Sequence, residues 1–201
     1  FTFLFQNQTI SYSIEPKNFI SEVVDEAKKI LVASNSKEIK EKKLSEMAQK
    51  VADINGIGMY SLGSYKKILN ESQLKEYKVL FEQYFLKSFT SRLTDYSDPK
   101  IEVLSSEKLN EKYTMVRSVL LATDQRPEVK IDWRVYTKNI DKPLIRDLIV
   151  EGLSLARTQK EEFASVIETN DGDITKLFDV LKDFINNEIK KLKIKKKKIE
   201  F

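Results

Sequence analysis

The stretch from residue 144 to residue 167 constrains the fold most, because its apolar spacing changes there from that of a strand to that of a helix. The first part alternates, with apolar residues on both sides of an extended chain. These residues are Leu144, Leu148 and Val150 on one side and Ile145 and Ile149 on the other. The pattern is typical of a strand covered on both faces, and Gly152 ends it.

A helix is expected directly after this strand. Thr158 and Glu161 have the spacing of a capping box, which marks a helix start. One apolar stripe continues the helix and is formed by Phe163, Val166 and Ile167. The strand therefore leads the chain into a helix that must pack against the same sheet.

Further amphipathic helices are expected on both sides of this stretch. The first begins at Pro16 and ends near Asn35, and the second runs roughly over residues 37–54. Asn70 and Gln73 form the capping box of a third helix, and Asp173 can cap a last one.

Three of the five glycines, Gly56, Gly58 and Gly63, lie between the second and third helices. Their spacing fits neither a P-loop nor a dinucleotide fingerprint, and no strand is expected before them. We therefore expect the glycines to let a short helix approach another element closely.

The third helix carries the most regular apolar stripe of the chain. Its members are Leu74, Tyr77, Phe81, Tyr84, Phe85, Phe89, Leu93 and Tyr96. Such a stripe either fills a core or lines an elongated apolar cavity, and its period does not distinguish the two.

Strand spacing begins after Pro99. Strands are expected at residues 100–104, 112–123 and 128–138, with a turn at residues 124–127. Together with the strand at residues 144–150 they make a meander between two groups of helices. This order predicts an α+β fold, with a curved antiparallel sheet of about four strands and helices over one face.

The composition excludes most catalytic sites. The chain has no histidine and no cysteine, so the commonest general base and the thiol nucleophile are missing. Glu161 and Glu162 are neighbours on a helix and cannot face one site, while Asp147 and Glu151 lie ~13 Å apart along a strand. We therefore expect no enzyme, no metal site and no cofactor, and binding remains.

The net charge of +4 comes from one segment. Residues 190–198 contain seven lysines, and the rest of the chain has 28 basic and 31 acidic side chains, a net charge of −3. A nearly neutral body argues against a nucleic-acid-binding face. The lysine-rich tail at residues 190–201 is either a solvated end or a helix extension that transiently contacts anionic lipid.

The first fifteen residues open with the apolar run FTFLF. This arm is either the end of a signal-peptide apolar region or a segment that packs on the domain. No apolar run approaches the ~20 residues that span a bilayer.

Several separated motifs resemble the MlaC family, also called the toluene-tolerance family. The family's strand of the form DVxxEGxSL and the helix after it are matched by Asp147, Glu151, Gly152, Ser154, Leu155, Gln159, Glu162 and Phe163. Its upstream LGxY motif and aromatic helix are matched by Leu62, Gly63, Tyr65, Tyr77, Phe81, Tyr84 and Phe89. The resemblance covers roughly residues 16–190.

The resemblance implies a nuclear-transport-factor-like sheet joined to a helical subdomain, within a single domain at residues 16–189. Its helical parts are expected at residues 16–98 and 156–189, and its sheet at residues 100–155. Family members are periplasmic and carry phospholipid between an outer-membrane lipoprotein complex and an inner-membrane ABC transporter that contains an MCE-domain protein. The resemblance therefore implies export through a signal peptide, a periplasmic location and no catalysis. We expect a monomer, with phospholipid as its cargo.

A phospholipid carrier needs a long apolar pocket, because two acyl chains of ~16 carbons hold a lipid in its bilayer by ~25 kcal/mol. The residues expected to form its walls are Met115, Val119, Ile131, Trp133, Val135, Leu148 and Val150 on the sheet, and Met59, Leu62, Phe81, Phe85, Phe89, Phe163 and Ile167 on the helices. No single basic residue identifies itself as the phosphate ligand. The alternative is a non-catalytic protein-interaction module of the same fold with a filled core.

Overall fold

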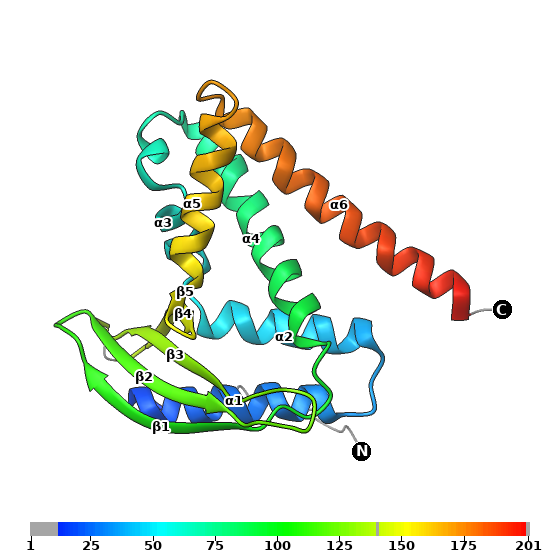
Figure 1. Ribbon diagram of the computed structural model, residues 1–201. Coiled ribbons are helices and arrows are strands. Elements are labelled where there is room, and N and C mark those ends of the chain that lie inside the picture. Colours follow the sequence, from blue (N-terminus) through cyan, green and yellow to red (C-terminus); the bar gives the residue numbers. More distant parts are fainter. Residues whose placement is uncertain (1–11, 140, 200–201) are drawn as a thin grey trace, which may run out of the picture.

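The computed structural model describes residues 12–139 and 141–199, with side chains as far as residue 187. Helices precede and follow a single antiparallel sheet (Figure 1). The helices are α1 (Pro16–Val32), α2 (Lys37–Val51), α3 (Ile54–Ser61), the 3₁₀ helix η1 (Gly63–Lys67), α4 (Glu71–Leu93), α5 (Leu155–Glu168) and α6 (Ile174–Ile199). The predicted α+β class is confirmed.

The sheet is a meander in which each strand pairs antiparallel with the next one in the chain. Its strands are β1 (Ile101–Lys108), β2 (Tyr113–Leu120), β3 (Val129–Tyr136), β4 (Leu144–Val150) and β5 (Leu153–Ser154). The sequence predicted about four strands, and the structure adds β5, a strand of 2 residues that forms a hairpin with β4. Register shifts between Val103 and Ser105 and between Arg134 and Val135 mark bulges.

One face of the sheet, called the inner face here, carries the apolar residues that pack in the core. Cross-strand partners share a face, so the pairs Val116–Trp133, Trp133–Leu148 and Ile131–Val150 define it. Helix α1 lies along this face at β1 and β2. The buried residues of this core are Phe19, Ile20, Val23, Val24, Val51, Val116, Val135 and Ile145.

The helices α3, α4, α5 and α6 form a second body above the sheet (Figure 1). Its buried core includes Ile57, Leu62, Tyr77, Leu80, Phe81, Phe163, Ile167, Leu177, Phe178 and Leu181. A Cβ added to Gly58 would lie 2.6 Å from Cδ1 of Phe81, and the Tyr77 hydroxyl donates to the Gly58 carbonyl at 2.8 Å. The expectation that glycines allow a close helix approach is confirmed at Gly58.

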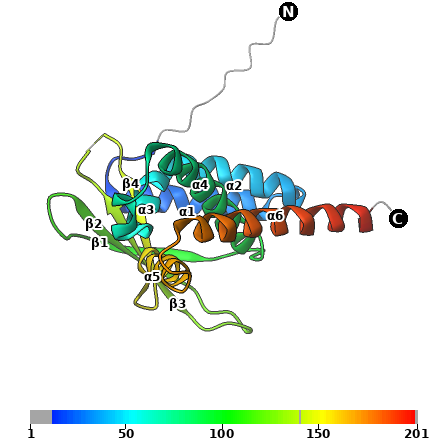
Figure 2. The ribbon, with the colours of Figure 1, turned by 90° about the horizontal axis from the view of Figure 1, so that it is seen from above.

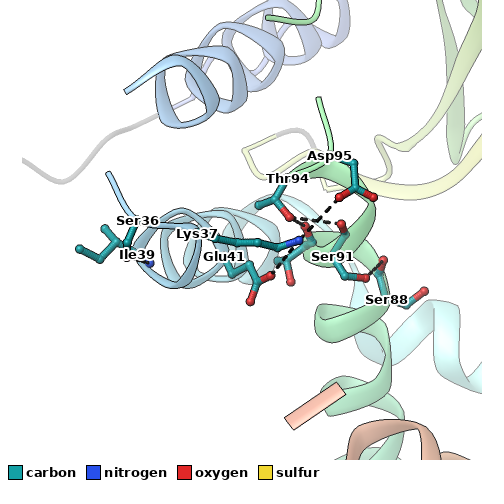
Figure 3. A network of polar contacts seen from close by, with 9 residues as sticks. Ser36, Lys37, Ile39, Glu41, Ser88, Ser91, Thr94 and Asp95 are labelled. Carbon is teal, nitrogen blue, oxygen red and sulfur yellow. Dashed lines mark hydrogen bonds and ion pairs between the residues drawn. The ribbon is translucent and has the colours of Figure 1, made fainter. Parts of the chain in front are cut away.

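A third, smaller core joins α1 and α2 to the end of α4 and buries Ile30, Leu31, Leu44 and Met47. A polar network lies where α2 begins and α4 ends (Figure 3). The ammonium group of Lys37 lies 3.9 Å from Glu41 on its own helix and 3.6 Å from Asp95 just after α4. These contacts connect the start of α2 to the end of α4.

Two predicted helix boundaries are wrong. The helix expected roughly over residues 37–54 ends at Val51, because Ala52 bridges to Ile145 of the sheet and Asp53 caps α3. Helix α5 begins at Leu155 with Ser154 as its cap, four residues before the capping box that the sequence indicated. Thr158 lies inside the helix and donates its hydroxyl to the Ser154 carbonyl at 3.0 Å.

Helix α6 runs to Ile199 and includes the lysine-rich segment. Its first half packs against α4 and α5, and its second half projects beyond the other helices when the molecule is seen from above (Figure 2). Residues 1–11 of the predicted arm at residues 1–15, and the side chains of the tail from residue 188 on, lie outside the described part.

Candidate functional site

The junction between β4 and α5 is organised by one buried carboxylate. Asp147 is 5% exposed, and its two oxygens accept hydrogen bonds from the Ser154 hydroxyl at 2.6 Å and the Ala156 amide at 2.9 Å. The guanidinium of Arg134 lies 3.6 Å away. Because Ala156 is in the first turn of α5, the carboxylate occupies the position where a negative charge stabilises a helix start.

The turn between β4 and β5 requires an unusual backbone. Glu151 and Gly152 have φ angles of 49° and 82°, the two positive values that a two-residue hairpin turn of type I′ needs. The Glu151 carboxylate also accepts a hydrogen bond from the Lys130 amide on β3. The motif around Asp147, Glu151, Gly152 and Ser154 is therefore explained by local architecture.

Arg146, the residue before Asp147 on β4, holds the start of helix α3 in the same way. Arg146 Nε lies 2.5 Å from the Asp53 carboxylate, which also accepts from the Gly56 amide at 2.8 Å and so caps α3. The guanidinium carbon of Arg146 lies 4.7 Å from the centre of the Tyr136 ring. Arg146 and Asp147 thus fix the starts of α3 and α5 to the same strand.

The structure distributes the expected pocket residues over several apolar clusters. Five of them are almost completely buried and fill cores: Leu62, Phe81, Val135, Phe163 and Ile167. Phe85 packs against the core of the helical body, and Phe89 packs against the third core. Met59 is partly exposed and lines a cavity described below.

Four more of these residues form a partly exposed apolar surface on the inner face of β3 and β4. They are Ile131, Trp133, Leu148 and Val150. Leu153, which pairs with Val150, extends this surface and is 58% exposed. We call these five residues the open inner face, because α1 packs on this face mainly at β1 and β2.

The expectation that Met115 and Val119 share this face is wrong. Met115 pairs with Arg134 and Val119 with Lys130, so both lie on the outer face. The buried alternate positions of β2 are Thr114, Val116, Ser118 and Leu120. Apolar residues occur on both faces of β2, and the sequence pattern alone therefore did not identify its inner side.

Aromatic rings connect two of the cores along α4. The ring centres of Phe81 and Phe85 lie 6.1 Å apart, and those of Phe85 and Phe89 are also 6.1 Å apart, with the latter two rings nearly parallel. The row extends from the core of the helical body to the core between α1, α2 and α4. The stripe that the sequence indicated thus forms a continuous apolar ridge.

A cavity of about 400 Å³ opens where α2 ends, between α3, α4 and the start of β4. Its apolar wall contains Ile54, Met59, Phe81 and Leu144, and its rim contains Lys78, Glu82 and Lys142. A second cavity of about 410 Å³ lies between the start of α1 and the loop before β4. Sequence reasoning did not indicate Lys78 or Lys142, because nothing in the pattern distinguishes them from the many other lysines.

Tyr77 also reaches the first cavity, but its hydroxyl is already bonded to Gly58. Burial raises the pKa of this phenol strongly, because the phenolate would lose its hydration. In the described residues no three acidic, histidine or cysteine side chains are placed to hold a metal ion. Within the same residues, no helix has the length and apolar character needed to cross a membrane.

The fold defines a class of α+β protein in which a curved antiparallel sheet is joined to a helical subdomain. The family model of the MlaC protein matches residues 21–183. The chain belongs to the MlaC family, and the resemblance seen in the sequence is confirmed. Among curated proteins, none matches the chain.

A solved structure shares this fold. It is a phospholipid-binding protein from Ralstonia solanacearum in complex with a phospholipid, with a TM-score of 0.70 and 18% sequence identity. The similarity covers 85% of this chain and 96% of that chain. At this identity the comparison establishes the fold.

Proposed function

We propose that this protein binds phospholipid and carries it through the periplasm, without catalysing a reaction. The observation that carries the proposal is membership of the MlaC family over residues 21–183. It is supported by the fold shared with a protein that was solved in complex with a phospholipid. The proposed route runs between an outer-membrane lipoprotein complex and an inner-membrane ABC transporter that contains an MCE-domain protein.

The open inner face is the proposed contact surface for the acyl chains, together with Phe85 and Phe89, the partly exposed members of the α4 ridge. These side chains are apolar, and those of the open inner face remain partly exposed. Covering them with an acyl chain removes apolar surface from water at ~25 cal/mol per Å². Such burial offsets the cost of taking the lipid out of its bilayer.

The buried members of the expected pocket favour the alternative, a protein-interaction module with a filled core. Val135 and Ile167 are 0% exposed, so neither touches a lipid unless the sheet and the helices move apart. The two functions differ in one respect: a carrier loses its ligand when the open inner face becomes charged, and a filled module has no ligand to lose.

The test compares Val150→Glu with Val119→Glu, a matched substitution on the outer face of the same sheet. Val150→Glu is expected to reduce copurified phospholipid at least tenfold, because the carboxylate would lie beside the acyl chains. Val119→Glu is expected to keep the wild-type lipid content. Both variants are first checked for folding by circular dichroism and thermal unfolding. Full lipid occupancy in a folded Val150→Glu protein would contradict the proposed surface.

A further inference from the structure

The first cavity, between α2, α3, α4 and the start of β4, has a mixed lining, with an apolar floor beside the polar side chains of Gln49 and Asn55. Ile54, Met59 and Phe81 contribute to the floor. The only hydroxyl described among its lining residues, that of Tyr77, donates to the Gly58 carbonyl at 2.8 Å and is therefore already bonded. The floor suits a hydrocarbon chain.

The volume of the cavity matches one chain. At the ~30 Å³ that a water-sized group occupies in a liquid, about 400 Å³ holds roughly thirteen such groups. This corresponds to a single acyl segment of about twelve carbons. Two chains of ~16 carbons would need about 960 Å³ at the same packing.

The acidic groups at the cavity are already bonded. Asp53 is paired with Arg146 at 2.5 Å and accepts from the Gly56 amide. Glu82 accepts a hydrogen bond from the side-chain amide of Gln49 at 2.9 Å. The first carboxylate is therefore neutralised by a neighbour, and the second is held by an amide on the exposed side of the rim.

The two lysines of the rim, unlike its acidic residues, are available to a ligand. Lys78 on α4 and Lys142 before β4 both line the cavity and are exposed. Over residues 12–139 and 141–187, neither ammonium group has a carboxylate within ion-pair distance. The rim thus has two cations on different walls and one carboxylate, that of Glu82, so that its net charge is positive.

We propose that this cavity binds one acyl chain of an anionic amphiphile, with the phosphate or carboxylate head held by Lys78 and Lys142. The inference rests on the proposed function and deepens it, because it assigns a chain site and two headgroup ligands within the lipid carrier. An anionic head placed between two ammonium groups is attracted by both, and the attraction weakens with salt.

The test measures binding of dodecyl phosphate by the full chain, below the micelle concentration of the probe. Dodecanoate carries a carboxylate on a chain of the same class, and dodecyl maltoside carries no charge. The double variant Lys78→Gln/Lys142→Gln is expected to bind dodecyl phosphate about tenfold more weakly at low salt. Its affinity for dodecyl maltoside is expected to match that of the wild type.

Lys75→Gln/Lys138→Gln is the matched control, since these lysines lie on the same two segments, are exposed and do not line the cavity. This control is expected to bind every probe as the wild type does. Met59→Glu places a charge on the partly exposed wall and is expected to abolish binding of all three probes. Thermal unfolding confirms that each variant is folded before binding is compared.

Each outcome separates two conclusions. Preference for dodecyl phosphate over dodecanoate assigns a phospholipid head, and the reverse assigns a fatty acid. Equal affinity of the Lys78→Gln/Lys142→Gln variant and the wild type for both anionic probes would overturn the headgroup assignment.

If the protein carries phospholipid but binds none of the probes, the cavity assignment is wrong and the proposed function stands. If lysine-dependent probe binding occurs in a protein that never takes up phospholipid, the proposed function is wrong and the cavity assignment stands.

Discussion

Asp147 shows how a single buried residue determines a junction. Asp147 is 5% exposed, and its carboxylate accepts hydrogen bonds from both the cap residue and the first turn of α5. A buried carboxylate is costly unless its oxygens are hydrogen-bonded. Here two donors and the Arg134 guanidinium surround it, so the acid contributes to structure.

Replacing Asp147 by asparagine is expected to lower the free energy of unfolding by about 1–3 kcal/mol. The amide keeps one acceptor but presents an NH₂ group where the carboxylate accepted a hydrogen bond. Urea unfolding at neutral pH measures the loss. Asp132→Asn on the neighbouring strand is the control, with a change below ~0.5 kcal/mol expected. A loss of similar size in the two variants would contradict the role assigned to Asp147.

Because Tyr77 is buried, we expect the free energy of unfolding to fall as the pH rises above ~10. Burial raises the pKa of Tyr77, so the folded protein favours the neutral phenol more than the unfolded chain does. The phenol therefore contributes fully to the free energy of unfolding below the pKa of about 10 that tyrosine has in the unfolded chain. This contribution decreases as the pH rises above that value. Between pH 10 and 11, the free energy of unfolding of Tyr77→Phe should fall less steeply than that of wild type, by up to ~1.4 kcal/mol per pH unit. Identical slopes in urea unfolding would show that the phenol titrates normally.

At the scale of elements, the sequence predicted most helices and strands because their apolar periods are regular. It failed where tertiary contacts determine a boundary. Ala52 and Asp53 continue the helical pattern of α2, yet the chain leaves the helix there to bridge Ile145 and to cap α3. The bulge at Arg134 and Val135 likewise shifts which side chains of β4 face the core. No pattern in the local sequence predicts this bulge.

The candidate site was predictable only in part. The α4 ridge and the inner residues of β3 and β4 follow from clean periodicity, whereas β2 is apolar on both faces and its inner side was misassigned. The cavity rim joins Lys78 to Lys142 across long sequence separation. Only the fold brings such residues together.

Helix α6 extends beyond the folded body and carries the seven lysines of residues 190–198. We expect deletion of residues 190–201 to abolish binding to vesicles that contain anionic lipid, since each lysine near such a surface contributes ~1 kcal/mol before screening. Cosedimentation measures this, with uncharged vesicles as the control. Salt should release the full-length protein. Unchanged cosedimentation after the deletion would favour a solvated tail.

At the scale of the whole molecule, the proposed cargo is larger than either cavity described. Two chains of ~16 carbons occupy about 960 Å³ at ~30 Å³ per group, whereas the cavities measure about 400 and 410 Å³. A whole phospholipid therefore needs apolar surface beyond these two cavities, and the open inner face offers it. Arg146 and Asp147 hold α3 and α5 to β4 where the sheet meets the helical body.

Native mass spectrometry of the purified protein, followed by organic extraction and lipid analysis, tests the central claim most directly. A carrier is predicted to show an added mass of phospholipid size, removed by extraction, and to take up lipid again from vesicles. A protein that appears at its bare mass and takes up no lipid from vesicles would contradict the carrier function and favour the interaction module.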